Sequence, residues 1–88
     1  NEVKYNQTKN YAATKKYSTG TEVTGSMFEF SIVLGTGASS SNYLLTTSSD
    51  TQCALKGLQY PYSISLVATD QDIPANSVAK AISLKGLL

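Results

Sequence analysis

Residues 27–34 read Met-Phe-Glu-Phe-Ser-Ile-Val-Leu, and this stretch decides the fold class. Large apolar side chains recur at every second position, which is the period of a β-strand with one buried face. A helix would instead repeat its apolar positions every three to four residues. The strand therefore predicts a core face formed by Phe28, Phe30, Ile32 and Leu34.

Further strands are predicted on the C-terminal side of this segment. A Gly/Ser loop over 35–41 is followed by strands over 43–47 and 51–56, and the polar turn between these two strands predicts a hairpin. Another alternating strand is predicted over 60–68. The core candidates on these strands are Leu45, Leu55, Ile64 and Leu66.

The tail, residues 77–88, admits two interpretations. Ile82 and Leu84 alternate with polar neighbours as in a strand, whereas the wider apolar spacing also suits one helical turn. The strand is favoured. The segment closes on Leu87 and Leu88, and exposed leucines at this place are unusual unless they dock on another surface, so both are predicted partner contacts.

Residues 1–26 are predicted to form an extended arm or an edge segment. Tyr5, Tyr11 and Tyr17 recur at a spacing of six, which places them on one face of an extended chain and scatters them around a helix. Few apolar residues lie between them, so we expect all three tyrosines to contact a partner. Four of the seven lysines fall in the first sixteen residues. Solvated lysines that protect a sheet edge explain this bias, and the alternative is a surface that meets an acidic neighbour.

These segments together predict an all-β chain with a mainly antiparallel sheet of about four to six strands. Residues 1–88 are expected to form a single domain, with the sheet over 27–88. A chain of this size buries only about 60–65% of its unfolded surface. Cys53 is the only cysteine and there is no histidine, so neither an internal disulfide nor a zinc site can add stability. Packing against a partner chain is the remaining source of added stability.

Composition excludes several functions. Seven lysines face six acidic residues, and arginine is absent, which argues against nucleic acid as a partner. No apolar run is long enough to span a membrane. Without histidine there is no hydrolase triad, so we expect neither an enzyme nor a cofactor. We expect Cys53 to pack as a small apolar residue; the alternatives are an intermolecular disulfide and a reactive thiol.

Asp70 and Asp72 lie two residues apart in a predicted loop. Together with Asp50 and backbone carbonyls they could begin a calcium site. Aspartates that cap a turn are the commoner explanation of such a pair. We therefore predict no metal site.

The composition is also typical of exported proteins. About a quarter of the residues are Ser or Thr, and charged residues are few. The sequence begins at Asn1 without an initiator Met or a charged and apolar leader. We expect an extracellular or cell-surface protein whose signal peptide has been removed; a trimmed product is the alternative.

The order of segments resembles a known family. The strand over 28–34, the Gly/Ser loop and the strands over 43–47 and 51–56 resemble the C-terminal β-sheet part of bacterial type IV pilins. The start, rich in Lys and Tyr, looks like the separate globular subunit of split, geopilin-type pilins. A long apolar N-terminal helix and a C-terminal cysteine pair are absent, which suits a split subunit.

The resemblance implies a small sandwich or a pilin-like sheet with a structural role. Such a subunit would coat an extracellular filament or surface assembly and pack against a helical pilin-like chain and neighbouring copies. The alternative function is a secreted module that binds a carbohydrate or a receptor, with exposed tyrosines as stacking platforms. The candidate platforms are Tyr5, Tyr11, Tyr17, Tyr60 and Tyr62.

Overall fold

The computed structural model of the chain describes residues 2–58 and 62–85. The predicted contact residues Leu87 and Leu88, the platform candidate Tyr60 and the start of the strand predicted over 60–68 lie outside the described residues.

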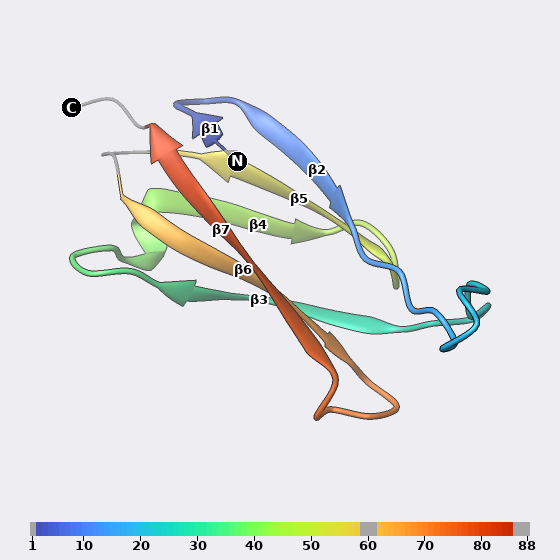
Figure 1. The fold of residues 1–88 in the computed structure, drawn as a ribbon. Coiled ribbons are helices and arrows are strands. Elements are labelled where there is room, and N and C mark those ends of the chain that lie inside the picture. The colour runs from blue at the N-terminus through green and yellow to red at the C-terminus, as the bar shows by residue number, and fades with distance from the viewer. Residues whose placement is uncertain (1, 59–61, 86–88) are drawn as a thin grey trace.

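The described residues form seven β-strands in two sheets, and they contain no α-helix (Figure 1). The all-β prediction is confirmed, whereas the predicted number of four to six strands is too low. The elements are β1 (Glu2–Lys4), β2 (Thr8–Ala12), β3 (Phe28–Leu34), the 3-10 turn η1 (Ser40–Asn42), β4 (Tyr43–Thr47), β5 (Gln52–Gly57), β6 (Ser63–Asp70) and β7 (Ser77–Lys85).

The larger sheet, sheet A, has the strand order β1-β7-β6-β3, and the smaller one, sheet B, has the order β2-β5-β4. All neighbouring strands are antiparallel except β1 and β7, which run parallel. The same grouping of the second to seventh strands occurs in immunoglobulin-type sandwiches. The described residues thus form two sheets that share one core, and this pair of sheets is called the sandwich below.

The N-terminal residues are strands rather than a free arm. β1 pairs with β7 and β2 pairs with β5, and both lie at a sheet edge, so the edge-segment interpretation holds for residues 2–12. Residues 13–27 contain no strand and form the long loop that leads to β3. The tail is a strand, β7, as favoured from its alternation.

The chain crosses from sheet A to sheet B at a close contact between β1 and β5. The Asn6 amide donates to the Gly57 carbonyl over 2.7 Å, and the Gly57 amide donates to the Gln7 carbonyl over 3.1 Å. A Cβ atom at Gly57 would lie 2.6 Å from the Lys4 carbonyl oxygen. Only glycine fits this crossing, which closes one end of the sandwich.

The core lies at this closed end. The buried cluster consists of Val3, Cys53, Leu55, Ile64, Leu66, Ile82 and Leu84. Of the predicted core residues, Phe28 is also buried, and Phe30, Ile32 and Leu45 are partly buried. The prediction for Leu34 is wrong, because its side chain is 45% exposed at the end of β3. Alternation selects the face of a strand, but burial also needs a covering layer.

Candidate functional site

The two layers of the sandwich do not cover each other over their full length. On the inner face of β7, Ile82 and Leu84 are buried, whereas Val78 and Lys80 on the same face are exposed. Figure 1 shows why: the β6–β7 hairpin runs past the end of sheet B, whereas the start of β3 stays beside that sheet, where the Phe28 amide donates to the Asp50 carbonyl over 2.8 Å. Apolar side chains of sheet A therefore reach solvent at this open end of the sandwich.

A groove of about 350 Å³ lies between the edges of the two sheets at the open end. Its sheet A side is lined by Phe30, Leu66, Ala68, Val78 and Lys80, and its sheet B side by residues 11–14. A second hollow of about 310 Å³ lies next to it and shares Thr14, Ala68 and Val78 with it. The two adjacent hollows together are called the open-end groove below.

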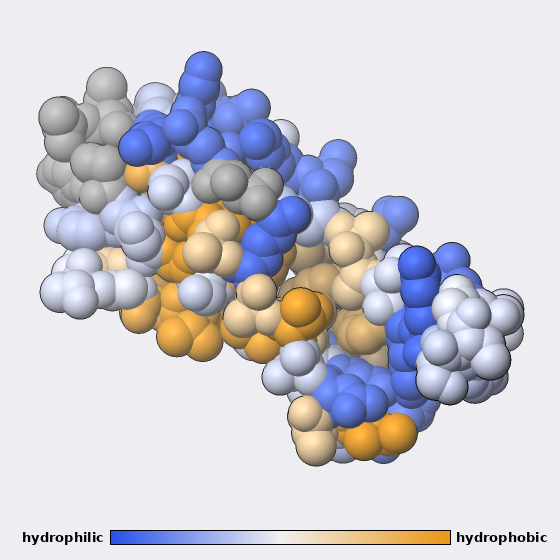
Figure 2. Space-filling view, in the orientation of Figure 1, coloured by the Kyte–Doolittle hydropathy of each residue, from blue (hydrophilic) through white to orange (hydrophobic). Residues whose placement is uncertain are grey.

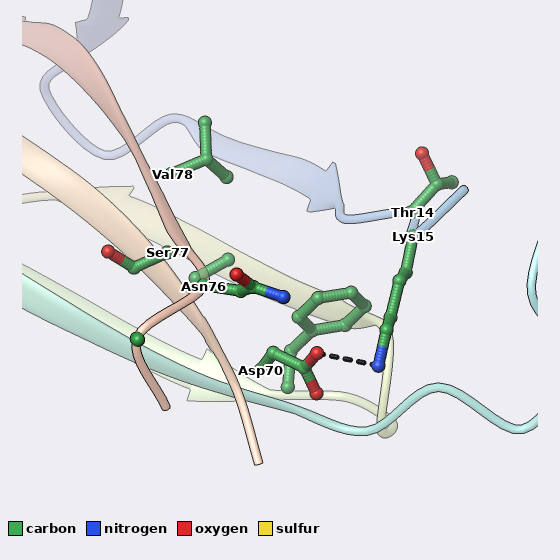
Figure 3. Close-up of a pocket in the computed structure, with 9 residues that line it drawn as sticks. Thr14, Lys15, Asp70, Asn76, Ser77 and Val78 are labelled. Carbon is green, nitrogen blue, oxygen red and sulfur yellow. Dashed lines mark ion pairs between the residues drawn. The ribbon is translucent and has the colours of Figure 1, made fainter. Parts of the chain in front are cut away.

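An ion pair closes the far side of the open-end groove. Lys15 Nζ lies 2.6 Å from Asp70 Oδ2, and Asp70 is buried. Figure 3 shows the two side chains pointing toward each other, from the segment after β2 and from the end of β6. The hydrogen bond with Lys15 lowers the pKa of Asp70 and raises the pKa of Lys15. The pair fixes residues 13–16 over sheet A.

Asp70 also caps the turn that follows β6. The Asp72 amide donates to Asp70 Oδ1 over 3.0 Å, which is the turn-capping role predicted for this pair. Within residues 2–58 and 62–85 no cluster of three or more His, Cys, Asp and Glu side chains could hold a metal ion. No helix in the same residues is long and apolar enough to cross a membrane.

Tyr11 forms a wall of the open-end groove. Lys80 Nζ lies 5.6 Å from the centre of its ring, a cation–π distance. Its hydroxyl is buried and has no hydrogen-bond partner among the described residues. Burial and then the charge of nearby Cys53 raise the pKa of Tyr11. The ring therefore helps to hold the Lys80 ammonium at the mouth of the groove.

The outer face of sheet A carries no charged side chain at its centre. Neighbouring strands pair small side chains there, as in Ser65 with Ala81 and Val67 with Ala79. Figure 2 shows apolar surface exposed in the middle of the molecule, between more hydrophilic ends. The centre of this face consists of Ser31, Val33, Ser63, Ser65, Val67, Thr69, Ala79, Ala81 and Ser83, and charged residues of the same face flank it, namely Glu2, Lys4, Glu29 and Lys85. The centre of this face therefore offers no charge that would oppose a close neighbour.

The predicted tyrosine face is not formed. Tyr5 and Tyr17 are both exposed, but Tyr5 belongs to the β1–β2 turn at the closed end, and Tyr17 belongs to the long loop at the other end (Figure 1). Tyr11 lies in the groove, and Tyr62 is partly buried beside Gly37. A stacking platform built from several of these rings is therefore not assembled by the described residues.

Val78 and Lys80 are the site residues that the sequence analysis missed. Both residues lie on the inner face of β7, beyond the last residue that sheet B covers. This position results from the pairing of strands that are far apart in the sequence, so the local sequence pattern does not reveal it. Cys53 lies in the core as a free, fully buried thiol, and burial raises its pKa.

Comparisons with known proteins add no assignment: no protein-family model, no curated protein and no solved structure matches this chain.

Proposed function

We propose that the chain is a structural, non-enzymatic subunit of an extracellular filament or surface assembly. The observation that carries the proposal is the open end of the sandwich, where the inner face of sheet A continues past sheet B and Val78 remains 65% exposed. Fully burying a side chain of this size stabilises a complex by about 1.5–3 kcal/mol. Contact with a neighbour would supply the missing layer.

The outer face of sheet A gives the proposal a second contact surface. The small, uncharged side chains at its centre allow close approach of another backbone without the desolvation of a charge. A helical pilin-like chain, as in split pilins, is the proposed partner on this face, and neighbouring copies are the proposed partners at the open end.

The test is sedimentation velocity and thermal melting of the purified chain over a range of concentrations. We expect association and a melting temperature that rises with concentration, because association stabilises the folded state by mass action. Val78→Asp should weaken association, since it places a charge in the contact. Thr46→Asp on the exposed face of β4 is the matched control and should leave association unchanged.

A monomer with a sharp melt that is independent of concentration would contradict the proposal. That result would favour the alternative of a self-contained secreted module that binds a ligand.

A further inference from the structure

Half of β7 has an unpaired backbone edge. β1 pairs only with Ser83, Leu84 and Lys85, so within the described residues no strand lies beside Ser77–Ile82 on this side. Edges of this kind pair readily with an added strand. The unpaired edge borders the open-end groove, because Val78 and Lys80 line the groove from the same segment.

Hydrogen bonds to β6 show which backbone groups of β7 are free. The Leu84 amide donates to the Tyr62 carbonyl over 2.8 Å, and the Asp70 amide donates to the Asn76 carbonyl over 2.9 Å. Bonded pairs alternate along an antiparallel ladder, so the even-numbered residues of β7 bond to β6. Ser77, Ala79 and Ala81 therefore direct their N–H and C=O groups toward the open edge.

The β1 strand confirms this direction, because the Tyr5 amide donates to the carbonyl of odd-numbered Lys85 over 3.0 Å. A strand that continues the position of β1 along β7 would bond to Ser77, Ala79 and Ala81. Its alternate side chains would enter the groove opposite Val78, Lys80 and Ile82.

The charge of the groove specifies one of those side chains. Lys15 is neutralised by Asp70, whereas Lys80 has no carboxylate within ion-pair distance among residues 2–58 and 62–85. An inward-pointing lysine on an edge strand opposes indiscriminate strand pairing. A carboxylate on the added strand would pair with the Lys80 ammonium and so remove its unfavourable effect on strand pairing. Lys80 therefore favours partners with an acidic residue at this position over other partners.

We propose that the edge of β7 accepts an extended segment of a partner protein with the pattern apolar-x-acidic-x-apolar, whose carboxylate pairs with Lys80. The pattern is symmetric, so it fits either strand direction. The segment adds a strand to sheet A and covers the exposed inner face. This inference rests on the proposed assembly role and gives the open end a partner other than a copy of this chain, whose sequence contains no such pattern.

The probe is the synthetic peptide Thr-Val-Thr-Asp-Thr-Val-Thr, and its matched control carries Lys in place of Asp. Binding is followed by amide chemical shifts of the full chain. We expect the Asp peptide to shift the amides of Ser77, Ala79 and Ala81, and to bind at least about tenfold more tightly than the Lys peptide. Lys80→Glu should reverse this preference.

A second variant tests backbone pairing. Ala79→Pro removes an amide that faces the open edge and leaves the ladder to β6 intact, so the chain should fold and lose peptide binding. Ala79→Ser keeps the amide and should retain binding. Shifts on β3 or β4 in place of β7, or equal affinity for both peptides, would overturn the inference.

The two proposals fail separately. If the peptide does not bind but the chain still associates with rising concentration, strand addition is refuted and the assembly function stands. If the Asp peptide binds as expected while the chain stays a monomer at every concentration, strand addition is supported and self-assembly of the chain is refuted.

Discussion

Val78 and Leu84 lie six residues apart on the same face of β7, yet Leu84 is 1% exposed and Val78 is 65% exposed. The difference arises in the opposite layer. Leu84 belongs to the buried cluster with Val3 and Leu55, while the part of sheet A that carries Val78 projects beyond sheet B. One strand thus contributes both to the core of the chain and to a surface that a neighbour can cover.

The two ends of β7 should respond differently to truncation. Leu84→Ala removes packed methyl groups and leaves a cavity, so it should lower the free energy of unfolding by about 2–5 kcal/mol. Val78→Ala removes exposed atoms and should change it by less than about 0.5 kcal/mol. Urea unfolding of both variants at low protein concentration measures this contrast. Equal losses would show that the open end is covered in the isolated chain.

Gly57→Ala should separate β1 from sheet B. The new methyl group would lie 2.6 Å from the backbone oxygen of Lys4, and a backbone atom cannot rotate away. Overpacking of this kind costs about 1–3 kcal/mol. Hydrogen exchange gives the local readout. The amides of Tyr5 and Asn6 should exchange faster, whereas the exchange of the β3 amides should change no more than the loss of global stability requires. An unaltered melting temperature would contradict the close contact.

The strands with clear alternation could be predicted from the sequence, and the sites of contact could not. The prediction over 43–47 matches β4, and the prediction over 27–34 differs from β3 by one residue. β1 has only three residues, which are too few to show a period of two. Val3 is buried because β1 pairs with β7, and this pairing places Val3 opposite Leu84. Local pattern carries no information about such pairing.

The errors at strand ends have the same physical origin. Leu34 and Val78 both occupy the inner face of their strands, beside buried Ile64 and Ala68, yet both are exposed at a strand end. Periodicity of two identifies the face, while the length of the opposing layer decides burial. The Lys15–Asp70 pair joins residues far apart in sequence, so only the turn-capping part of the role of Asp70 could be predicted.

Acid should weaken the closure of the open-end groove. The pKa of Asp70 is lowered in the folded chain by its hydrogen bond with Lys15, so the pair stabilises the fold above the ordinary aspartate pKa of 3.8 and loses this effect as the pH falls below it. The pKa of Lys15 is raised by the same hydrogen bond, so the pair also loses its stabilising effect at high pH, as the pH rises past the ordinary lysine pKa of 10.5. Melting temperatures of the native chain and Asp70→Asn should differ most between these limits.

Removal of the other partner supplies the control for the ion pair. Lys15→Met leaves the buried Asp70 carboxylate without its cation and should destabilise the chain more than Asp70→Asn, which leaves a lysine that can turn toward solvent. A difference between native and Asp70→Asn melting temperatures that persists unchanged at about pH 2 would show that charge is not the cause.

The Cys53 thiol should be inert in the folded chain. Burial raises its pKa, and the reactive species is the thiolate, so both access and ionisation oppose modification. A disulfide reagent at pH 8 should react at least about 100-fold more slowly with the native chain than with the chain in denaturant, because reaction requires opening of the core. Rapid native reaction would instead support the alternative of an intermolecular disulfide.

Tyr11→Phe tests the unpaired hydroxyl at the wall of the groove. The hydroxyl is buried without a partner among the described residues, and its removal relieves a desolvation penalty of about 1–3 kcal/mol in part, so the variant should be as stable as the native chain or more stable by about 1 kcal/mol. The ring remains, so the contact with Lys80 is kept. Urea unfolding at neutral pH measures the change. A clear loss of stability would mean that the hydroxyl is hydrogen-bonded in solution, and bound water would then be part of the groove.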